Sequence, residues 1–292
     1  MKSDFFDPKE FPMRVEIELT NDCNSYCTYC PRKYMRYEIG YMSLKLYQRL
    51  IDEISTFHNR TLVLFRRGES LLHPEFLKML FYAKGKFKEI QLATNVSLMN
   101  KNIANAIAEC VSFISFSIEL PENYGSYRKL DYNNVLNNIN YFLSINKKVK
   151  TQVSMVDSYN IDQEYIERFR NQWINRVDRV RIYEEHSSDG RFGSLKNSMR
   201  KRKPCVKPFS DILIFWDGMV GRCNHDWGEK PLDSIVNKSI QKVWDSSTYN
   251  SLRKQHLSLS ITDEVCSKCD SWYEKIDMCD IGLVYEKSTK RD

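Results

Sequence analysis

The chain has 292 residues, of which 42% are hydrophobic and 13% aromatic, with 10 glycines and 8 prolines. This composition excludes a largely disordered chain, and the length suits one large α/β domain or a domain of about 200 residues with a smaller appendage. A net charge of +6 and a pI near 8.7 suit an anionic partner but do not require one.

The first ten residues lack the basic start and the apolar core of a signal peptide. No apolar run reaches the roughly 18 residues of a membrane helix. We therefore expect a cytoplasmic protein without membrane attachment. In that reducing compartment the nine cysteines are expected to bind metal or take part in chemistry rather than form disulfides.

Hydrophobic periodicity over the first 185 residues predicts an alternation of short strands and longer helices. The predicted strands are residues 15–19, 62–65, 89–93, 113–118, 150–156 and 179–183. The predicted helices are residues 44–57, 74–84, 101–110, 132–145 and 162–173. This alternation favours a parallel sheet with crossover helices, curled into a partial (β/α)6 barrel of the TIM type.

Polar residues follow the predicted strands where a barrel of this type places its chemistry, at the C-terminal ends. They are residues 20–30 after the first strand, residues 66–69 after the second, Thr94 and Asn95 after the third, and Ser117 and Glu119 at the fourth. We expect these side chains to converge on one mouth of the barrel.

The pattern changes after residue 185. Residues 187–204 are rich in Ser, Gly and Lys and predict a linker. The basic run at 200–203 is interpreted as part of that linker, because no aromatic residues interleave with it as in a nucleic-acid site. A hairpin is predicted at 212–216 and 219–222 with Gly218 in the turn, followed by one helix at 240–254. The predicted domains are 1–186 and 205–292.

The strongest motif is Cys23-Asn-Ser-Tyr-Cys27-Thr-Tyr-Cys30, directly after the first predicted strand. Three thiolates within eight residues can hold three corners of a cubane iron-sulfur cluster and leave the fourth iron open to a ligand. The alternative is a zinc knuckle, but a closed zinc site needs four ligands, and no fourth Cys or His lies nearby in the sequence.

This motif resembles that of the radical S-adenosylmethionine (SAM) superfamily, which carries the same spacing with an aromatic residue, here Tyr29, before the last cysteine. The resemblance covers most of the chain. It implies that SAM binds the open iron of a 4Fe-4S cluster and is cleaved to a 5′-deoxyadenosyl radical, which abstracts a hydrogen atom from a substrate. It also implies an electron donor such as flavodoxin or ferredoxin.

Further family motifs predict SAM contacts. Gly68 and Glu69 resemble the end of the family's Gly-Gly-Glu, with Arg67 in place of the first Gly. Asn95 resembles the middle of Thr-Asn-Gly, with Val96 in place of Gly. Ser117 and Glu119 resemble polar residues that contact the SAM ribose and carboxylate. The alternative for Gly68 and Glu69 is an ordinary surface turn, and the alternative for Asn95, Ser117 and Glu119 is ordinary capping at a strand end.

A second cysteine set consists of four residues near the C-terminus: Cys205, Cys223, Cys266 and Cys269. Four thiolates can enclose a second cluster or a tetrahedral zinc ion, and their spacing alone does not separate the two. Residues 223–257 resemble the SPASM/twitch extension. The short twitch form holds one auxiliary 4Fe-4S cluster, which implies two clusters in total and a small C-terminal α+β iron-sulfur domain.

Several other residues have weaker signals. Cys110 is interpreted as a buried small residue, and Cys279 as a spare cysteine of the tail or a hydrogen-atom donor. Trp244, Tyr249 and Leu252 are predicted to be core residues. His225, two residues after a proposed cluster ligand, and His186, at the end of the sixth strand, are candidate proton acceptors because a histidine pKa lies near neutral pH.

The expected function is oxidation or epimerisation of a sugar or aminocyclitol, in which the auxiliary cluster accepts an electron. The same chemistry could mature a ribosomal peptide, although no leader-binding domain is evident at the N-terminus. A remote alternative is a non-catalytic zinc protein that binds nucleic acid through residues 200–203.

Overall fold

The computed structural model describes residues 6–35, 38–158, 161–185, 201–227, 230–270, 272 and 282–287. Within these ranges the strands form one sheet in the order β10-β6-β5-β4-β3-β2-β1-β7-β8-β9. The six strands of the barrel are β1 (Arg14–Ile17), β2 (Thr61–Val63), β3 (Glu89–Thr94), β4 (Phe113–Ser117), β5 (Lys150–Asp157) and β6 (Arg179–Glu184). They pair in parallel, each with its neighbour in sequence.

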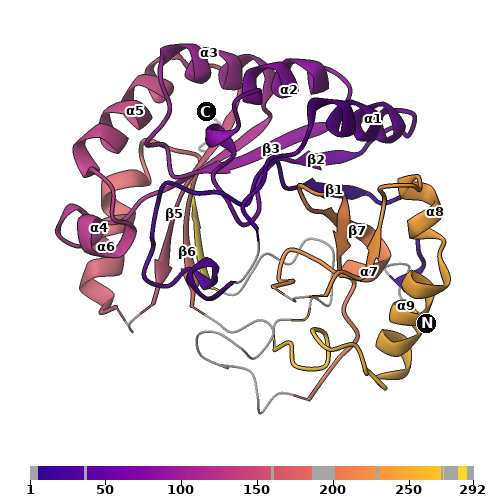
Figure 1. Cartoon of the computed structure of the whole chain (residues 1–292). Helices are drawn as coiled ribbons and strands as arrows, with labels where there is room; N and C mark the ends of the chain where they lie inside the picture. Colours follow the sequence, from indigo (N-terminus) through magenta and orange to yellow (C-terminus); the bar gives the residue numbers. More distant parts are fainter. Residues whose placement is uncertain are drawn as a thin grey trace, which may run out of the picture.

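The helices of the barrel lie on the outside of the strands (Figure 1). They are α1 (Leu44–Ser55), α2 (Phe76–Ala83), α3 (Lys101–Cys110), α4 (Pro121–Arg128), α5 (Tyr132–Ile145) and α6 (Gln163–Trp173). Short 3-10 helices follow two strand ends, η2 (Pro31–Tyr34) and η3 (Ser70–Leu72). Polar N-caps define several helix starts, for example Ser43, which accepts from the backbone N–H of Leu46 before α1.

The predicted partial barrel is confirmed, with each predicted strand and helix bound lying within two residues of the observed one. Helix α4 was not predicted, because its segment carries Gly125 and lacks a clear apolar stripe. The edge strand β10 (Gly282–Glu286), antiparallel to β6, was also missed; two of its side chains, Leu283 and Val284, are exposed.

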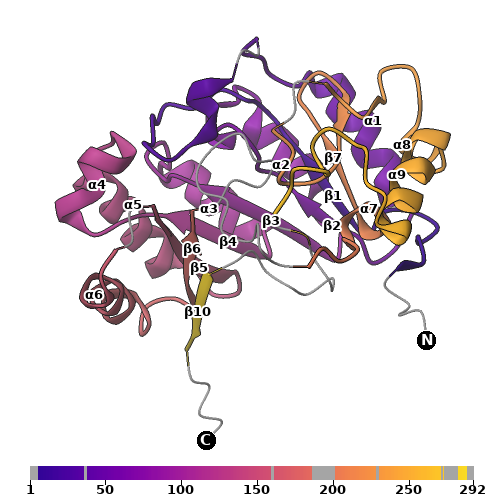
Figure 2. The same ribbon diagram turned by 90° about the horizontal axis from the view of Figure 1, so that it is seen from below.

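The C-terminal region continues the same sheet on the other side of β1. Strand β7 (Asp211–Ile214) pairs in parallel with β1, and β8 (Met219–Gly221) and β9 (Asp233–Ser234) follow in antiparallel pairing. Gly218 lies in the predicted turn with φ +84°, a conformation that favours glycine. Figure 2 shows β7 near one end of the row of strands and β10 at the other.

The single helix predicted at 240–254 is wrong. The chain forms α8 (Ile240–Trp244) and α9 (Ser247–Ser258), separated at Asp245 and Ser246. The Ser246 hydroxyl accepts from the backbone N–H of Tyr249 and starts a new helix there. The predicted core residues Trp244, Tyr249 and Leu252 are buried, and Tyr249 and Trp244 pack with ring centroids 5.2 Å apart. A one-turn helix, α7 (Lys207–Ser210), precedes β7.

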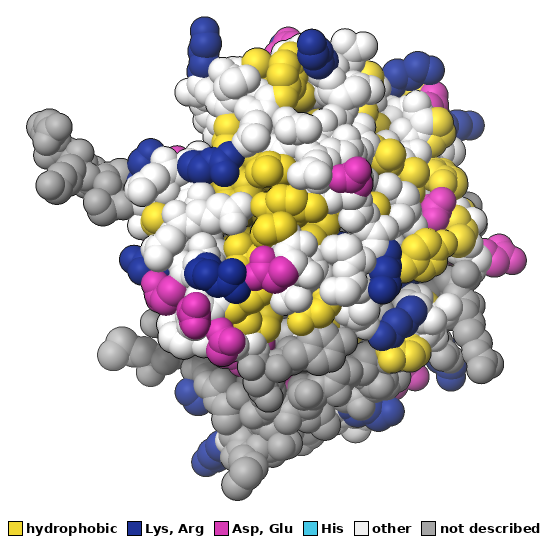
Figure 3. Space-filling model, turned by 90° about the vertical axis from the view of Figure 1, so that its left-hand side faces the viewer, with side chains coloured by type: hydrophobic (Ala, Val, Ile, Leu, Met, Phe, Trp, Pro, Cys, Tyr) yellow, Lys and Arg dark blue, Asp and Glu magenta, His cyan; other side chains and the backbone are white. Residues whose placement is uncertain are grey.

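The surface of the side that carries α4 and α6 is mixed in character. Figure 3 shows hydrophobic side chains in the middle of this face, with Lys and Arg side chains scattered among acidic ones. A nucleic-acid site gathers basic side chains along the path of the phosphates, whereas the Lys and Arg side chains of the described residues on this face stand apart from one another. In the part of the chain that is described, no helix combines the length and apolar character needed to cross a bilayer.

Candidate functional site

The first cysteine set lies in the loop after β1, at the mouth of the barrel, and short hydrogen bonds hold it. The Ser25 hydroxyl is 3.0 Å from the sulfur of Cys27, and the Ser25 backbone N–H donates to the sulfur of Cys23 across 3.4 Å. The Arg32 guanidinium donates to the carbonyl oxygens of Cys23 and Ser25. These hydrogen bonds therefore fix the conformation of the loop that carries the three thiols.

Residues from β3 and α4 anchor the same loop. Asn95 donates from Nδ2 to Asn24 Oδ1 across 2.9 Å and lies 3.9 Å from the sulfur of Cys23. The Ser25 hydroxyl donates to the carbonyl oxygen of Arg128 at the end of α4, across 2.6 Å. Asn95 therefore lies beside the cysteine loop, and its predicted contact with SAM stays a prediction.

Burial raises the pKa of the Cys23 thiol to about 12 and also raises that of Cys30. A thiol with a raised pKa is protonated near neutral pH and is a poor nucleophile, but iron displaces the proton from a thiol that coordinates it. The two thiols therefore suit a metal centre better than a role as nucleophiles. Three cysteines on one loop supply three cluster ligands, and the chemistry of this donor set fits a 4Fe-4S cluster with one open iron.

Glu69 follows β2, and hydrogen bonds to both of its carboxylate oxygens fix its side chain. Its Oε1 accepts from the Thr94 hydroxyl across 2.8 Å, and its Oε2 accepts from the Asn95 backbone N–H across 2.7 Å. Burial raises its pKa. Gly68 is required here because an added Cβ would lie 2.3 Å from the carbonyl oxygen of Asp22, a residue of the cysteine loop.

Arg67, which stands where the family pattern has glycine, is paired with Glu18. Its Nε and Nη2 donate to the two carboxylate oxygens of Glu18 across 2.6 and 2.7 Å. Both side chains are almost completely buried, and the guanidinium lies 3.9 Å from the ring centroid of Phe215 on the segment after β7. The substituted residue therefore contributes to the barrel interior through a bidentate ion pair.

A second buried acidic residue, Glu119, follows β4. Its side chain accepts from the Tyr29 hydroxyl across 3.0 Å and from the Arg128 guanidinium across 2.9 Å. Burial raises the pKa of Glu119, and Arg128 opposes that change. The Oε2 atom of Glu119 is buried without a hydrogen-bond partner. The predicted residues Tyr29 and Glu119 are thus brought together, and Ser117 ends β4 two residues earlier.

Arg181 is a buried arginine of β6 whose guanidinium lies 4.9 Å from the ring centroid of Tyr183. Its neighbours along β6, Val180 and Ile182, belong to the hydrophobic core with residues of α6, so the alternation of a strand turns Arg181 to the interior. It is 3% exposed, its register partner on β5 is Ser154, and its Nε and Nη2 have no hydrogen-bond partner.

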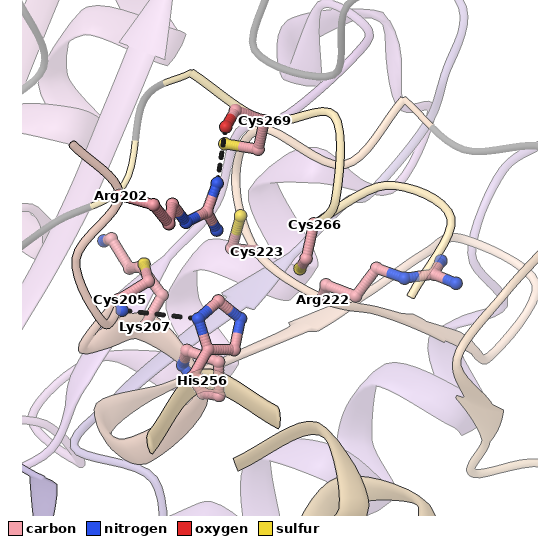
Figure 4. Close-up of a pocket in the computed structure, with 9 residues that line it drawn as sticks. Arg202, Cys205, Lys207, Arg222, Cys223, His256, Cys266 and Cys269 are labelled. Atoms are coloured by element: carbon pink, nitrogen blue, oxygen red, sulfur yellow. Dashed lines mark hydrogen bonds between the residues drawn. The ribbon is translucent and has the colours of Figure 1, made fainter. Parts of the chain in front are cut away.

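The second cysteine set lines a pocket between the segments that flank β7, β8 and α9. Cys205, Cys223, Cys266 and Cys269 surround it together with His256 (Figure 4). Burial raises the pKa of Cys205 to about 11 and that of Cys223 and Cys266 well above the usual value. Four thiols, two of them buried and two partly buried, come from three segments of the chain and match a closed cluster site.

Among the described residues, no group of three Cys, His, Asp or Glu side chains is arranged to hold a single metal ion. A cubane cluster binds each cysteine through a different iron atom and does not need the four sulfur atoms to converge on one ion.

Basic side chains surround the second cysteine set. Arg202 donates from Nη1 to the carbonyl oxygen of Cys269 across 2.6 Å, and its Nε has no hydrogen-bond partner. The Arg222 guanidinium turns away from the pocket in Figure 4 and binds Asp226 and Asp263. The positive charge that acts on Cys205 therefore comes from Lys207 and Arg202, which both line the pocket.

His256 closes one side of this pocket. It is 1% exposed, and its Nδ1 accepts from the backbone N–H of Cys205 across 3.3 Å. Burial, with a contribution from the Arg202 charge, lowers the pKa of His256 to about 4. The ring is therefore neutral near pH 7.

One arginine links the two cysteine sets. Arg66 follows β2, and its positive charge is close enough to Cys30 to lower the pKa of that thiol. Its Nη2 donates to the carbonyl oxygen of Asp226 across 2.7 Å, and its guanidinium lies 4.6 Å from the ring centroid of Trp227. Asp226 and Trp227 follow Cys223 of the second set. Arg66 therefore joins the end of β2 to the segment that follows Cys223, and its charge also acts on Cys30.

The remaining predicted residues have varied positions. His225 is buried, and its backbone N–H donates to the sulfur of Cys223 across 3.4 Å. Cys110 is buried at the end of α3, as predicted. His186, Cys279 and most of the linker 187–204 lie outside the described residues.

Sequence reasoning placed Arg66 among the polar residues 66–69 expected at the barrel mouth but gave it no role, and it missed Arg128 and His256. Arg128 is a single arginine in a segment without periodicity, and no sequence signal identified it. His256 was detectable, because Tyr249, Leu252 and His256 follow helical spacing and a histidine in a buried stripe is unusual.

Family profiles match both the barrel and the C-terminal region of the chain. A profile described as the radical SAM superfamily matches residues 17–182, and a profile described as the SPASM iron-sulfur cluster-binding domain matches residues 205–270.

Two curated proteins share local sequence similarity. The cofactor-modifying protein of tungsten-containing aldehyde ferredoxin oxidoreductase from Pyrococcus furiosus is 26% identical over 106 residues, 36% of this chain and 30% of that protein. The antilisterial bacteriocin subtilosin biosynthesis protein AlbA from Bacillus subtilis is 33% identical over 95 residues, 32% of this chain and 21% of that protein. The chain spans less than a third of the length of these relatives in the matched regions.

Solved structures share the fold. SuiB from Streptococcus suis, bound to the precursor peptide SuiA, superposes with a TM-score of 0.69 at 14% identity over 91% of this chain and 72% of SuiB. BtrN in complex with AdoMet and 2-DOIA superposes with a TM-score of 0.61 at 16% identity, over 89% of this chain and 93% of BtrN. The structure of anSMEcpe with bound AdoMet and Cp18Cys peptide superposes with a TM-score of 0.64 at 17% identity, over 88% of this chain and 86% of anSMEcpe. At these identities the similarity shows the fold alone.

Proposed function

Because the chain belongs to the radical SAM superfamily and carries a SPASM iron-sulfur domain, we propose that it is an oxidoreductase that dehydrogenates or epimerises a small molecule of the sugar or aminocyclitol type. It is a radical SAM enzyme that uses SAM, a 4Fe-4S cluster and an auxiliary SPASM cluster. When bound, these groups supply a 5′-deoxyadenosyl radical that removes a hydrogen atom and an auxiliary centre that accepts an electron.

The observation that carries this proposal is the position of Arg66. This residue lies close to Cys30 of the first set and is hydrogen-bonded to Asp226 beside the second set. A substrate in the region that Arg66 borders would face both centres, as removal of a hydrogen atom followed by removal of an electron requires.

The protein's own residues would hold SAM and the clusters as follows. Cys23, Cys27 and Cys30 would hold the first cluster, and Cys205, Cys223, Cys266 and Cys269 the auxiliary one. Glu69 retains acceptor capacity for the SAM ammonium beside the hydrogen bonds from Thr94 and Asn95. Gly68 brings this segment against the cysteine loop.

The buried pair of Glu119 and Arg128, with Tyr29, forms another part of the proposed site. The unpartnered Oε2 of Glu119 is available to accept a hydroxyl hydrogen bond from SAM or substrate. His225, buried next to Cys223, is the proposed proton acceptor, and His186 is a second candidate.

The proposal is tested with the anaerobically reconstituted enzyme, SAM, a reductant and aminocyclitols or sugars deuterated at the carbon that bears the hydroxyl group. We expect deuterium to appear in 5′-deoxyadenosine. A dehydrogenated product would have lost two hydrogen atoms, and an epimer would keep the mass of the unlabelled substrate after solvent hydrogen replaces deuterium. Failure of all candidates to yield deuterated 5′-deoxyadenosine would contradict this substrate class.

Cysteine variants separate the two centres. Cys27→Ala should abolish formation of 5′-deoxyadenosine, whereas Cys269→Ala should retain some SAM cleavage but stop substrate turnover. Cys110→Ala is the matched control and should retain both. Equal loss of cleavage in the first two variants would contradict the division of roles, and colourless protein with stoichiometric zinc in place of about eight irons would contradict both clusters.

Peptide maturation is the second candidate function. The local similarity to AlbA and the fold similarity to SuiB and anSMEcpe favour it. A panel of peptides with SAM and reductant tests it by mass spectrometry. Loss of two mass units per new link in a peptide, with no reaction of any cyclitol, would replace the small-molecule proposal.

A further inference from the structure

The two ring nitrogen atoms of His256 have different surroundings. Nδ1 accepts a hydrogen bond from the Cys205 backbone N–H across 3.3 Å. A neutral imidazole has one protonated nitrogen, so an accepting Nδ1 places the proton on Nε2. The tautomer thus follows from the hydrogen bond that Nδ1 makes.

The Nε2 atom of His256 is buried and has no hydrogen-bond partner. A buried N–H group without an acceptor is energetically unfavourable, so such a group indicates a missing partner. The residue lines the pocket of the four cysteines, and in Figure 4 its second ring nitrogen faces the side on which Cys266 lies.

We propose that His256 donates its Nε2 hydrogen to a sulfur atom of the auxiliary cluster and thereby raises the reduction potential of that cluster. The inference rests on the proposed binding of this cluster by Cys205, Cys223, Cys266 and Cys269. The identity of the substrate does not affect it.

The effect on the potential follows from electrostatics. Reduction adds negative charge to the cluster, and a hydrogen bond to sulfur stabilises the reduced state more than the oxidised one. The Arg202 guanidinium, which lines the same pocket, acts in the same direction. A higher potential makes the centre a better acceptor of the electron that an oxidised substrate releases.

A purely structural role for His256 would act through Nδ1, which holds the Cys205 backbone. The two roles belong to different ring atoms and can be separated by two amide substitutions. In His256→Asn the side-chain oxygen can replace Nδ1 as acceptor, but no donor reaches the position of Nε2. In His256→Gln the longer side chain places its amide donor near the position of Nε2.

The experiment uses the full-length chain with Cys23→Ala, Cys27→Ala and Cys30→Ala, so that the auxiliary cluster is the one observed. Its potential is measured by redox titration monitored by EPR, with and without each His256 substitution. We expect His256→Asn to lower the potential and His256→Gln to remain close to the parent. Equal shifts in both variants, or no shift in either, would overturn the inference.

A second measurement takes its deciding outcome from the parent protein, so that outcome does not depend on how well a variant folds. In the parent protein with ring-¹⁵N histidine, pulsed EPR of the reduced cluster should detect a ¹⁵N coupling and an exchangeable proton, and His256→Gln should remove the nitrogen coupling. Absence of that coupling in the parent would overturn the inference while leaving the cluster in place. Absence of the cluster itself would overturn both the inference and the proposed ligands.

Discussion

Arg66 and Asp226 are joined by a hydrogen bond of 2.7 Å between the guanidinium Nη2 and the main-chain carbonyl oxygen, across 160 positions of sequence. This contact ties the end of β2, beside the first cysteine set, to the turn that follows Cys223 of the second. Stability and the redox properties of the first centre therefore depend on the same side chain.

We expect Arg66→Gln to lower the free energy of unfolding by roughly 1.5–3 kcal/mol, because it removes a hydrogen bond from a charged group. It should also lower the reduction potential of the first cluster, since the positive charge near Cys30 is lost. Arg49→Gln is the matched control. Arg49 donates to the carbonyl oxygens of Ile235 and Lys238 away from the cysteines, and its loss should leave the potential unchanged in an EPR-monitored titration.

Arg181→Met should stabilise the protein without its ligands by about 1 kcal/mol or more. The substitution removes a buried charge whose Nε and Nη2 have no partner and replaces it with an apolar side chain of similar length. Arg128→Met should have the opposite sign, a loss of about 3–5 kcal/mol, because it leaves the carboxylate of Glu119 buried and uncompensated. Urea denaturation measures both, and a loss of stability in Arg181→Met would contradict the argument.

Val96 adopts a backbone conformation that β-branched residues avoid. Its φ is +67° although its side chain is fully buried, and it occupies the position of Gly in the Thr-Asn-Gly pattern. Glycine relieves this strain and alanine does not. At Val153, a fully buried residue of β5, the glycine variant should be less stable than the alanine variant. At Val96 this disadvantage of glycine relative to alanine should be smaller by about 1–2 kcal/mol, because glycine adopts the positive φ without strain. Equal differences at the two positions would show that no strain is stored at Val96.

His73 should make stability depend on pH on the acid side. It is 4% exposed, its Nε2 lies 2.9 Å from the carbonyl oxygen of Met42, and its Nδ1 accepts from the Glu75 backbone N–H. Burial lowers the pKa of His73 in the folded protein. Its contribution is therefore present above the unfolded pKa of about 6.5 and is lost as pH falls through the folded pKa, with a slope of at most about 1.4 kcal/mol per pH unit.

Chemical denaturation of the wild type and of His73→Gln between pH 7.5 and 5 tests this prediction. The glutamine cannot take up a proton, so the slope below about pH 6.5 should be smaller than in the wild type. His58→Gln, at an exposed position, is the control and should keep the wild-type slope. The same slope in the His73 variant as in the wild type would exclude His73 as its source.

Local patterns were sufficient for the barrel and for the cysteine ligands of the first set. Strand and helix bounds followed from hydrophobic periodicity, and three cysteines within eight residues identify a cluster loop whatever surrounds them. The helix at 240–254 was wrong for a local reason as well. The apolar spacing continues past Ser246, but the hydroxyl of this serine caps a new helix.

The sequence by itself thus determined the family, the two cysteine sets and the edge of the sheet at which the chemistry lies, because spacing and periodicity are properties of neighbouring residues. Only the tertiary structure decided which side chains meet there: Ser25 with Arg128 across 103 positions, Arg66 with Asp226 across 160, and Cys205 with His256 across 51. The physical reason is that a buried donor or charge must find its partner wherever the fold brings one near, and that partner leaves no periodic trace in the chain.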